Sequence, residues 1–386
     1  MRTPRMRAAS TAVALLFVTG VTSMSSAKTF VYVSNAQDGN IDAYVMDTGN
    51  GTLTPTGKTE AAKMVMPMAV SPDKRILYAV IRSQPVRVLS YAIDPATGAL
   101  TQKASAPLPD SMPYVSTDRT GRFLFTASYG GDKLAVSKIG ENGLVEAEAI
   151  QVIPTGRNAH SIVPDPSNKF VYAATLGANQ VLQFTFDGTS GKLTPNQPAA
   201  VSPDAGHGPR HIIFSPNNKS LYVLNELSGH VTQYAIDGGK GTLTLIDSVS
   251  SVPAEAGLAW GVPAAPVGAA PAPAAPADDR PKVWAADLQI TPNGKFLYST
   301  ERTTSKIALF TVAADTGKLT YVTNFPTEAQ PRGIRIDARG QYLIASGEKS
   351  DRISVYKIDQ STGKLGEPNR YPVGNGANWI EIVELQ

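Results

Sequence analysis

The sequence predicts an all-β fold, a seven-bladed β-propeller with four antiparallel strands in each blade. The first observation is a glycine-containing turn that recurs seven times, at steps of 45 to 50 residues apart from one step of 76. Its glycines are Gly51, Gly98, Gly143, Gly191, Gly241, Gly317 and Gly363. Repeats of this length that contain short strand patterns are typical of propellers and solenoids.

A second marker keeps the same period. It is an aliphatic residue followed, in six of the seven copies, by Tyr or Phe, which are residue types that fit a pleated sheet. The seven pairs are Val31-Tyr32, Leu77-Tyr78, Leu124-Phe125, Val171-Tyr172, Leu221-Tyr222, Leu297-Tyr298 and Leu343-Ile344. Two independent markers with one period indicate seven equivalent structural units.

The fifth copy illustrates how one unit is built. Residues 210–214 read as a short inner strand, and a Pro/Asn-rich turn leads to a second strand at 220–224. Residues 231–236 alternate between apolar and polar, as a half-buried third strand does, and a fourth strand begins at Leu243. Four antiparallel strands per unit is the blade of a β-propeller.

The two ends of the chain predict how the ring closes. The first copy starts at residues 30–33 with a second-strand sequence and lacks an inner strand before it. The last segment, 378–383, looks like an inner strand with no blade after it. Pairing these segments would complete the seventh blade and remove two open sheet edges.

Residues 1–27 have the layout of a cleaved secretory signal peptide. Arg2, Arg5 and Arg7 precede a short apolar run from Ala12 to Val21, and small residues up to Ala27 offer a cleavage site. We therefore expect a periplasmic protein whose mature part, 28–386, is a single propeller domain. No second apolar stretch is long enough to span a membrane, so we expect no membrane span in the mature chain.

Charge and cysteine content exclude several classes of function. The chain has 35 Lys and Arg against 32 Asp and Glu, and three of the arginines lie in the leader, so the mature chain carries no net charge. Nucleic-acid binding, which needs a clustered positive face, is not expected. The absence of cysteine excludes disulfides, thiolate metal sites and a cysteine nucleophile.

The step of 76 residues reflects an Ala/Pro-rich insertion at 253–281. Such a tract cannot build a core and is expected to form an extended, mobile loop. An inert insertion is the simpler interpretation. A lid over the site described below is the alternative, since the loop leads into an inner strand.

Two rings of residues are predicted at one rim of the propeller, where each inner strand starts and each second strand ends. The first ring, at the start of the inner strands, holds Met66, Pro113, His160, Arg210, Ala286 and Arg332. The second ring, four residues after the aromatic marker, holds Ala36, Arg82, Tyr129, Leu176, Glu226, Arg302 and Glu348. Ionisable groups near a channel cost desolvation energy unless they are partnered or used. The rings therefore indicate an anion or oxyanion site, or a structural network of ion pairs.

Three further histidines lie outside the two rings. His207, in the loop before Arg210, is expected to line the mouth of the channel. His211 is one residue out of the first ring, so strand alternation turns its side chain to the other face and favours packing over catalysis. His230 is expected to be a solvated turn residue. Motifs for a serine-hydrolase elbow, a zinc protease, a phosphate loop and an EF-hand are absent from the sequence.

Several segments resemble the bacterial seven-bladed 6-phosphogluconolactonases and, more distantly, the fungal carboxymuconate-lactonising enzymes. The resemblance covers residues 29–386 outside the insertion and is most specific in the second half. Its segments are His160-Ser-Ile-Val, Gly208-Pro-Arg-His, Val223-Leu-Asn-Glu-Leu, Trp284-Ala-Ala-Asp-Leu-Gln-Ile-Thr-Pro, Glu301-Arg-Thr, Pro326-Thr-Glu-Ala-Gln-Pro-Arg-Gly, Tyr342-Leu-Ile-Ala-Ser-Gly-Glu-Lys-Ser and Tyr371-Pro-Val-Gly-Asn-Gly.

The resemblance implies hydrolysis of a lactone at a catalytic cluster of His160, Arg210, Glu226 and Arg302. Water would attack the ring carbonyl with Glu226 or His160 as general base, and the two arginines would stabilise the oxyanion. The expected substrate-binding residues are Arg332, Glu348, Arg82, Tyr129 and His207. Neither a cofactor nor a metal ion is expected.

The leader favours an unphosphorylated sugar lactone, glucono-1,5-lactone, because a phosphorylated lactone is a cytosolic metabolite. Hydrolysis of the phosphorylated lactone is the alternative. A non-enzymatic propeller that binds the cell envelope is a second alternative, since fold alone never proves catalysis. A metal-dependent six-bladed gluconolactonase is disfavoured by the count of seven units.

Overall fold

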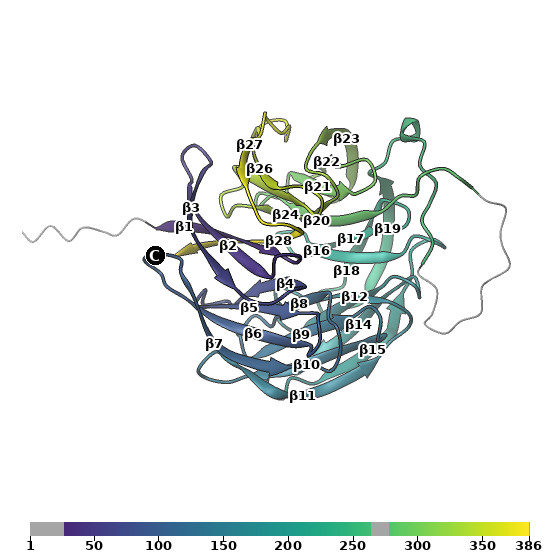
Figure 1. The fold of residues 1–386 in the computed structure, drawn as a ribbon. Helices are drawn as coiled ribbons and strands as arrows, with labels where there is room; N and C mark the ends of the chain where they lie inside the picture. Colours follow the sequence, from purple (N-terminus) through teal and green to yellow (C-terminus); the bar gives the residue numbers. More distant parts are fainter. Residues whose placement is uncertain (1–26, 264–277, 386) are drawn as a thin grey trace, which may run out of the picture.

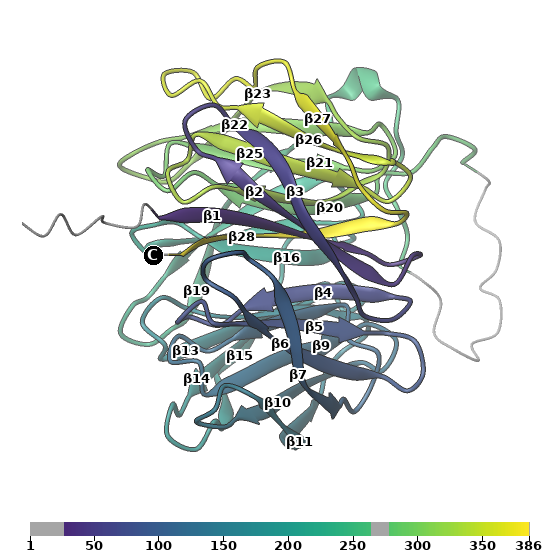
Figure 2. The same ribbon diagram turned by 60° about the vertical axis from the view of Figure 1, so that its left-hand side comes forward.

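The computed structural model describes residues 27–263 and 278–385, and these form a closed ring of seven four-stranded antiparallel sheets (Figures 1 and 2). The inner strands of neighbouring sheets contact one another in the cyclic order β28, β4, β8, β12, β16, β20, β24 and back to β28. The predicted seven-bladed propeller is therefore confirmed. All but one residue of the predicted leader lies outside the described residues.

The strands of the first four blades follow one order from the channel outward. In the first blade they are β28 (Ala377–Leu385), β1 (Lys28–Asn35), β2 (Asn40–Asp47) and β3 (Thr52–Glu60). In the second they are β4 (Val65–Val70), β5 (Ile76–Ile81), β6 (Arg87–Ile93) and β7 (Leu100–Pro107). In the third they are β8 (Tyr114–Thr117), β9 (Phe123–Ser128), β10 (Lys133–Ile139) and β11 (Val145–Pro154). In the fourth they are β12 (Ala159–Pro164), β13 (Phe170–Thr175), β14 (Gln180–Phe186) and β15 (Leu193–Val201).

The last three blades repeat this order. The fifth has β16 (Pro209–Phe214), β17 (Ser220–Asn225), β18 (His230–Ile236) and β19 (Leu243–Ser250). The sixth has β20 (Ala285–Ile290), β21 (Phe296–Glu301), β22 (Lys306–Val312) and β23 (Leu319–Pro326). The seventh has β24 (Pro331–Ile336), β25 (Tyr342–Gly347), β26 (Arg352–Lys357) and β27 (Asn369–Pro372).

The two ends of the chain close the ring in the first blade, as predicted. Strand β28 pairs antiparallel with β1, with Tyr32 opposite Glu381 and Phe30 opposite Val383. Ile380 and Val383 of β28 are buried, so the last strand contributes apolar area to the core as well as hydrogen bonds.

The hydrophobic core lies mainly between neighbouring blades, and the two sequence markers meet there. The hydroxyl of Tyr222 in the fifth blade donates to the carbonyl of Gly317 in the sixth, and Tyr298 donates in the same way to Gly363. Gly317 has a φ of +70°, and a Cβ on it would lie 2.9 Å from the Tyr222 hydroxyl. The turn therefore requires glycine for its backbone and for the close approach of the next blade.

A β-bulge interrupts the pairing of the inner strand with the second strand in six of the seven blades. In β16, for example, the register shifts between Pro209 and His211, so Arg210 is an extra residue without a partner in β17. The unpaired residues at the other bulges that skip a single position are His160, Arg332 and Asn378. In β4 and β20 the shift spans Met66-Pro67 and Ala286-Asp287. Because a bulge re-aims a side chain, it brings the first ring toward the channel.

The start of the insertion is more structured than expected. Residues Ala254–Ala256 form a short 3-10 helix, Ala259 pairs with Lys282, and the amide of Gly261 donates to the carbonyl of Leu227. The prediction of an extended conformation over 253–281 is therefore wrong for residues 253–263. Residues 264–277 lie outside the described residues. No helix in the described part of the chain is long and apolar enough to cross a membrane.

Candidate active site

A cavity of about 380 Å³ opens at one end of the channel, and its walls come from both predicted rings. The lining residues are Arg82, Pro113, Tyr129, His160, Arg210, Glu226, Val262, Trp284, Arg302 and Arg332. All four predicted catalytic residues are among them, as are three of the five predicted substrate-binding residues. The structure thus brings together side chains from six blades that the sequence separates by up to 250 residues (Arg82 to Arg332).

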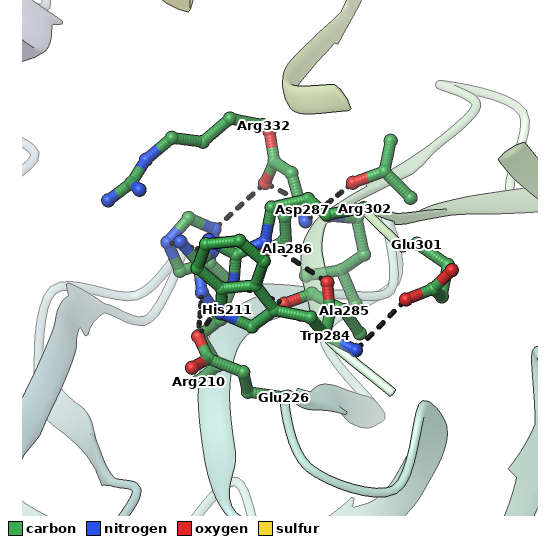
Figure 3. Close-up of polar contacts among 12 residues, drawn as sticks. Arg210, His211, Glu226, Trp284, Ala285, Ala286, Asp287, Glu301, Arg302 and Arg332 are labelled. Atoms are coloured by element: carbon green, nitrogen blue, oxygen red, sulfur yellow. Dashed lines mark hydrogen bonds and ion pairs between the residues drawn. The ribbon is translucent and has the colours of Figure 1, made fainter. Parts of the chain in front are cut away.

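Glu226 lines this cavity and forms ion pairs with two arginines (Figure 3). Its Oε2 atom accepts from Nε of Arg210 at 2.7 Å and from Nη2 of Arg302 at 3.0 Å. All three residues are buried. Burial alone would raise the pKa of Glu226, but Arg302 and Arg210 outweigh burial and hold this pKa below its usual value. Glu226 is therefore a carboxylate at neutral pH.

Main-chain carbonyls of the sixth blade fix the two arginines further. Arg302 donates from Nε to the carbonyl of Trp284 at 3.0 Å and from Nη2 to that of Ala285 at 3.0 Å. Nη1 of Arg210 donates to the carbonyl of Ala286. Burial lowers the pKa of Arg302 to about 9, opposed by the charge of Glu226, so this guanidinium keeps its charge at neutral pH. Two fixed cations that line the cavity are suited to stabilising an oxyanion.

His160 has a different environment from Glu226. Its side chain is buried, and its Nδ1 atom has no hydrogen-bond partner among the described residues. Burial and the charge of Arg210 hold the pKa of His160 well below 6.5, so the imidazole is neutral at neutral pH. The ring contacts Tyr129 and His211 edge-on, with centroid distances of 5.9 and 5.2 Å. An uncharged imidazole on the cavity wall can accept a proton from water.

Two further arginines complete the wall. Arg332 pairs with Glu348, with 3.1 Å between Nη1 and Oε1, so Glu348 acts on the cavity through Arg332 rather than lining it. Arg82 donates from Nε to the hydroxyl of Ser111 at 3.0 Å, and its Nη1 atom lies 3.7 Å from the sulfur of Met66. Among the described residues Arg82 pairs with no carboxylate. Burial lowers the pKa of Arg82 to about 10, which leaves it charged at neutral pH.

Two lining residues were missed by the sequence analysis. The indole of Trp284 stacks on Arg302, with 3.7 Å between the guanidinium carbon and the ring centroid, and it remains 38% exposed. Its position directly before an inner strand was the available signal. Val262, from the ordered start of the insertion, also lines the cavity. The indole of Trp284 gives the site a flat apolar surface against which the carbon face of a sugar ring can pack.

The structure corrects the interpretation of three histidines. His207 does not line the cavity; its ring packs against those of His230 and Trp260, with centroid distances of 4.8 and 5.0 Å. His230 is partly buried in this cluster, so the expectation of a solvated residue is wrong. His211 lies outside this cavity and packs against Tyr114 and Trp379, as the preference for packing predicts. Its side chain does not turn away from the first ring as expected, however, because its Nε2 atom lies 3.0 Å from Nη1 of Arg210. The bulge in β16 breaks the alternation on which that expectation rested.

Within residues 27–263 and 278–385, no three His, Asp or Glu side chains are arranged to hold a metal ion.

Comparison with known proteins identifies the family of this chain. Residues 20–382 match the family model described as "Lactonase, 7-bladed beta-propeller". The chain belongs to this lactonase family. Membership makes it a lactonase-type hydrolase with a small lactone as the class of substrate.

The similar proteins include enzymes and one structure of related fold. Proteins named 6-phosphogluconolactonase from Serratia proteamaculans and Erwinia tasmaniensis are each 39% identical, over 92% and 93% of this chain and 99% of their own length. The structure of a periplasmic gluconolactonase from Pseudomonas aeruginosa matches with a TM-score of 0.78 over 93% of this chain and 99% of that chain. Its sequence identity is 24%, so this likeness concerns the fold.

Proposed function

We propose that this protein hydrolyses a sugar δ-lactone and that its preferred substrate carries a phosphate group, as 6-phosphogluconolactone does. The similarity to proteins named 6-phosphogluconolactonase supports the phosphorylated substrate more strongly than glucono-1,5-lactone, which the leader favours. The observation that carries the choice is the charge of the cavity wall.

The cavity wall holds more positive than negative charge. Four arginines line it, Arg82, Arg210, Arg302 and Arg332, whereas Glu226 and Glu348 are the carboxylates paired with them. Two positive charges are left over. A phosphate monoester carries between −1.5 and −2 charges at neutral pH, since its second pKa is about 6. An unphosphorylated lactone has no charge with which to balance this excess.

In the proposed mechanism His160 is the general base. Glu226 is held by two arginines, whereas the imidazole of His160 lines the cavity and is neutral. His160 takes a proton from water as the water oxygen bonds to the lactone carbonyl carbon. The carbonyl oxygen becomes an anion held by Arg210 and Arg302. The bond from that carbon to the ring oxygen then breaks, and the proton passes from His160 to the ring oxygen.

The binding roles follow from position. Arg82 carries no carboxylate partner among the described residues, so we assign it to the phosphate group. Arg332, held by Glu348, and Tyr129 face the sugar hydroxyls. Trp284 packs on the carbon face of the ring. The catalytic steps use side chains of this chain and water.

The test is a pH-stat assay of the purified mature protein with 6-phosphogluconolactone and with glucono-1,5-lactone, each corrected for spontaneous opening. We expect kcat/KM to be at least about tenfold higher for the phosphorylated lactone, because hydrogen bonds to charged groups contribute about 1.5–3 kcal/mol. A preference for the unphosphorylated lactone would overturn the assignment of Arg82. Turnover of neither lactone would overturn the proposed function.

Export to the periplasm is a further part of the proposal and rests on the leader sequence alone. Cell fractionation together with the mass of the mature protein tests it. Export predicts a periplasmic product that begins near Lys28, whereas a full-length product in the cytoplasm contradicts it.

A further inference from the structure

A third ring of residues lies one position beyond the first ring on the inner strands. Its members in three blades are Tyr114, His211 and Trp379, whose rings pack edge-on with centroid distances of 5.2 to 5.9 Å. Asp287 holds the same position in the sixth blade, next to Ala286. All four residues line a second cavity of about 320 Å³ in the channel, separate from the candidate active site.

We propose that Asp287 and His211 are a positioning pair that fixes Arg210 for its role in lactone hydrolysis. The proposal rests on the proposed function, which makes Arg210 the donor to the oxyanion. Neither residue lines the cavity in which the lactone would bind, so both would act through Arg210.

The hydrogen bonds of Asp287 determine which ring nitrogen of His211 carries the proton. Oδ1 of Asp287 lies 2.9 Å from Nδ1 of His211, and it also accepts from the amide of Leu288 at 2.9 Å. Oδ2 accepts from the amide of Ile334 at 3.0 Å. A carboxylate accepts only, so Nδ1 of His211 must be the donor. The neutral imidazole then has a lone pair on Nε2.

That lone pair faces Arg210. Nε2 of His211 lies 3.0 Å from Nη1 of Arg210, and arginine can only donate, so this tautomer makes the contact a hydrogen bond (Figure 3). The opposite tautomer, or an imidazolium, would place two donors face to face. Burial and the charge of Arg210 lower the pKa of His211 to about 4, which agrees with a neutral ring at neutral pH.

Asp287 and His211 add a hydrogen bond to those that already hold the Arg210 guanidinium. Glu226 fixes Nε of Arg210, and the carbonyl of Ala286 and His211 fix Nη1. His211 is the contact that approaches from the side of the second cavity. Without it, Nη1 of Arg210 keeps only the bond to the Ala286 carbonyl, and the guanidinium can shift from its position at the lactone carbonyl. A displacement of about 1 Å can cost about 100-fold in rate.

Two substitutions of His211 distinguish an effect on the position of Arg210 from an effect of losing the packed imidazole. In His211→Gln the amide oxygen can take the place of Nε2 and accept from Arg210. In His211→Asn the amide nitrogen can take the place of Nδ1 and keep the bond to Asp287, but nothing reaches Arg210. Both variants remove the imidazole. His211→Gln keeps the hydrogen bond to Arg210, and His211→Asn keeps the one to Asp287.

The experiment measures kcat and KM of both variants for the lactone that the wild type turns over. We expect kcat to fall about 10- to 100-fold for His211→Asn with little change in KM, and to stay within about fivefold of the wild type for His211→Gln. Asp287→Ala should resemble His211→Asn. Asp165→Ala, which removes a buried carboxylate that accepts main-chain amides in a turn outside the site, is the control for the effect of losing a buried aspartate.

A readout independent of activity is the 15N spectrum of histidine-labelled wild-type protein at neutral pH. The expected pattern for His211 is protonated Nδ1 and unprotonated Nε2, and this pattern should change in Asp287→Ala. Equal losses of kcat in His211→Gln and His211→Asn, or a proton on Nε2 of His211 in the wild type, would overturn the positioning pair. Turnover of no lactone by the wild type would refute the proposed function, while the spectrum would still report on the pair.

Discussion

The hydroxyl of Tyr222 donates a hydrogen bond to the main-chain carbonyl of Gly317, 2.6 Å away and 95 residues further along the chain. This bond joins the fifth blade to the sixth. We expect Tyr222→Phe to lower the free energy of unfolding by about 0.5–1.5 kcal/mol, because a partly buried hydrogen bond between blades is lost. Denaturant unfolding measures the change, with Tyr371→Phe on the partly buried outer strand β27 as control. Equal stability of Tyr222→Phe and the wild type would show that the bond is unimportant.

The same bond explains why the fold could be predicted from the sequence. The aromatic marker and the glycine marker touch each other between blades, so each copy must preserve both. Phe125 and Ile344 lack the hydroxyl, and the pattern survives there through packing alone, since both residues are fully buried. Repetition thus revealed the strands, their number and the rim at which the polar residues gather.

The site could be predicted only in part, for a physical reason. The rings were found because histidine, glutamate and several arginines share equivalent positions with Met, Pro, Leu and Ala. The environment of His211 was not predictable, because a one-residue bulge in β16 shifts every later side chain to the opposite face. Asn378 completes the first ring, but it was not recognised because the closing strand has no turn or marker after it.

The closing strand provides a second test of stability. Removing residues 377–386 should lower the free energy of unfolding by several kcal/mol, because Ile380, Val383 and Leu385 each lose buried apolar area and β1 becomes an open edge. Thermal unfolding measures this change. A synthetic peptide of residues 377–386 should restore part of the loss. An unchanged unfolding temperature in the truncated protein would contradict closure by β28.

Arg210→Ala should reduce kcat for the lactone about 10²- to 10³-fold, the usual cost of losing one donor to an oxyanion. The matched control is Arg119→Ala, which removes an arginine that binds main-chain carbonyls beside the second cavity. It should leave kcat within about twofold of the wild type. Initial rates by pH-stat and unfolding curves on both variants separate catalysis from folding. Wild-type turnover by Arg210→Ala would remove Arg210 from the mechanism.

Arg82→Gln separates recognition of the phosphate group from catalysis. We expect kcat/KM for 6-phosphogluconolactone to fall about 10- to 100-fold, since the charged hydrogen bond to phosphate is lost. The value for glucono-1,5-lactone should stay within about twofold. Arg87→Gln, on the third strand of the same blade, should affect neither lactone. An equal loss with both lactones would assign Arg82 to the common part of the substrate instead.

The pH dependence distinguishes His160 from other general bases. Burial comes first, and the positive charges of Arg210, Arg332 and Arg302 add to it, so protonation of His160 is disfavoured and its pKa lies well below 6.5. The base is therefore active throughout the neutral range. With glucono-1,5-lactone, which has no phosphate that titrates near pH 6, kcat/KM should stay level as the pH falls through 6.5 and decline only below it.

His160→Asn completes this test, because it should lower kcat about 10²- to 10⁴-fold and abolish the acid limb. Glu226 also has a lowered pKa, and as the base it would produce a similar acid limb in the wild type. The variant separates the two residues: an acid limb that persists in His160→Asn assigns the base to Glu226. Rates are measured after subtraction of spontaneous lactone opening at each pH. A wild-type acid limb centred at or above pH 6.5 would contradict both assignments, since neither group in this cavity titrates there.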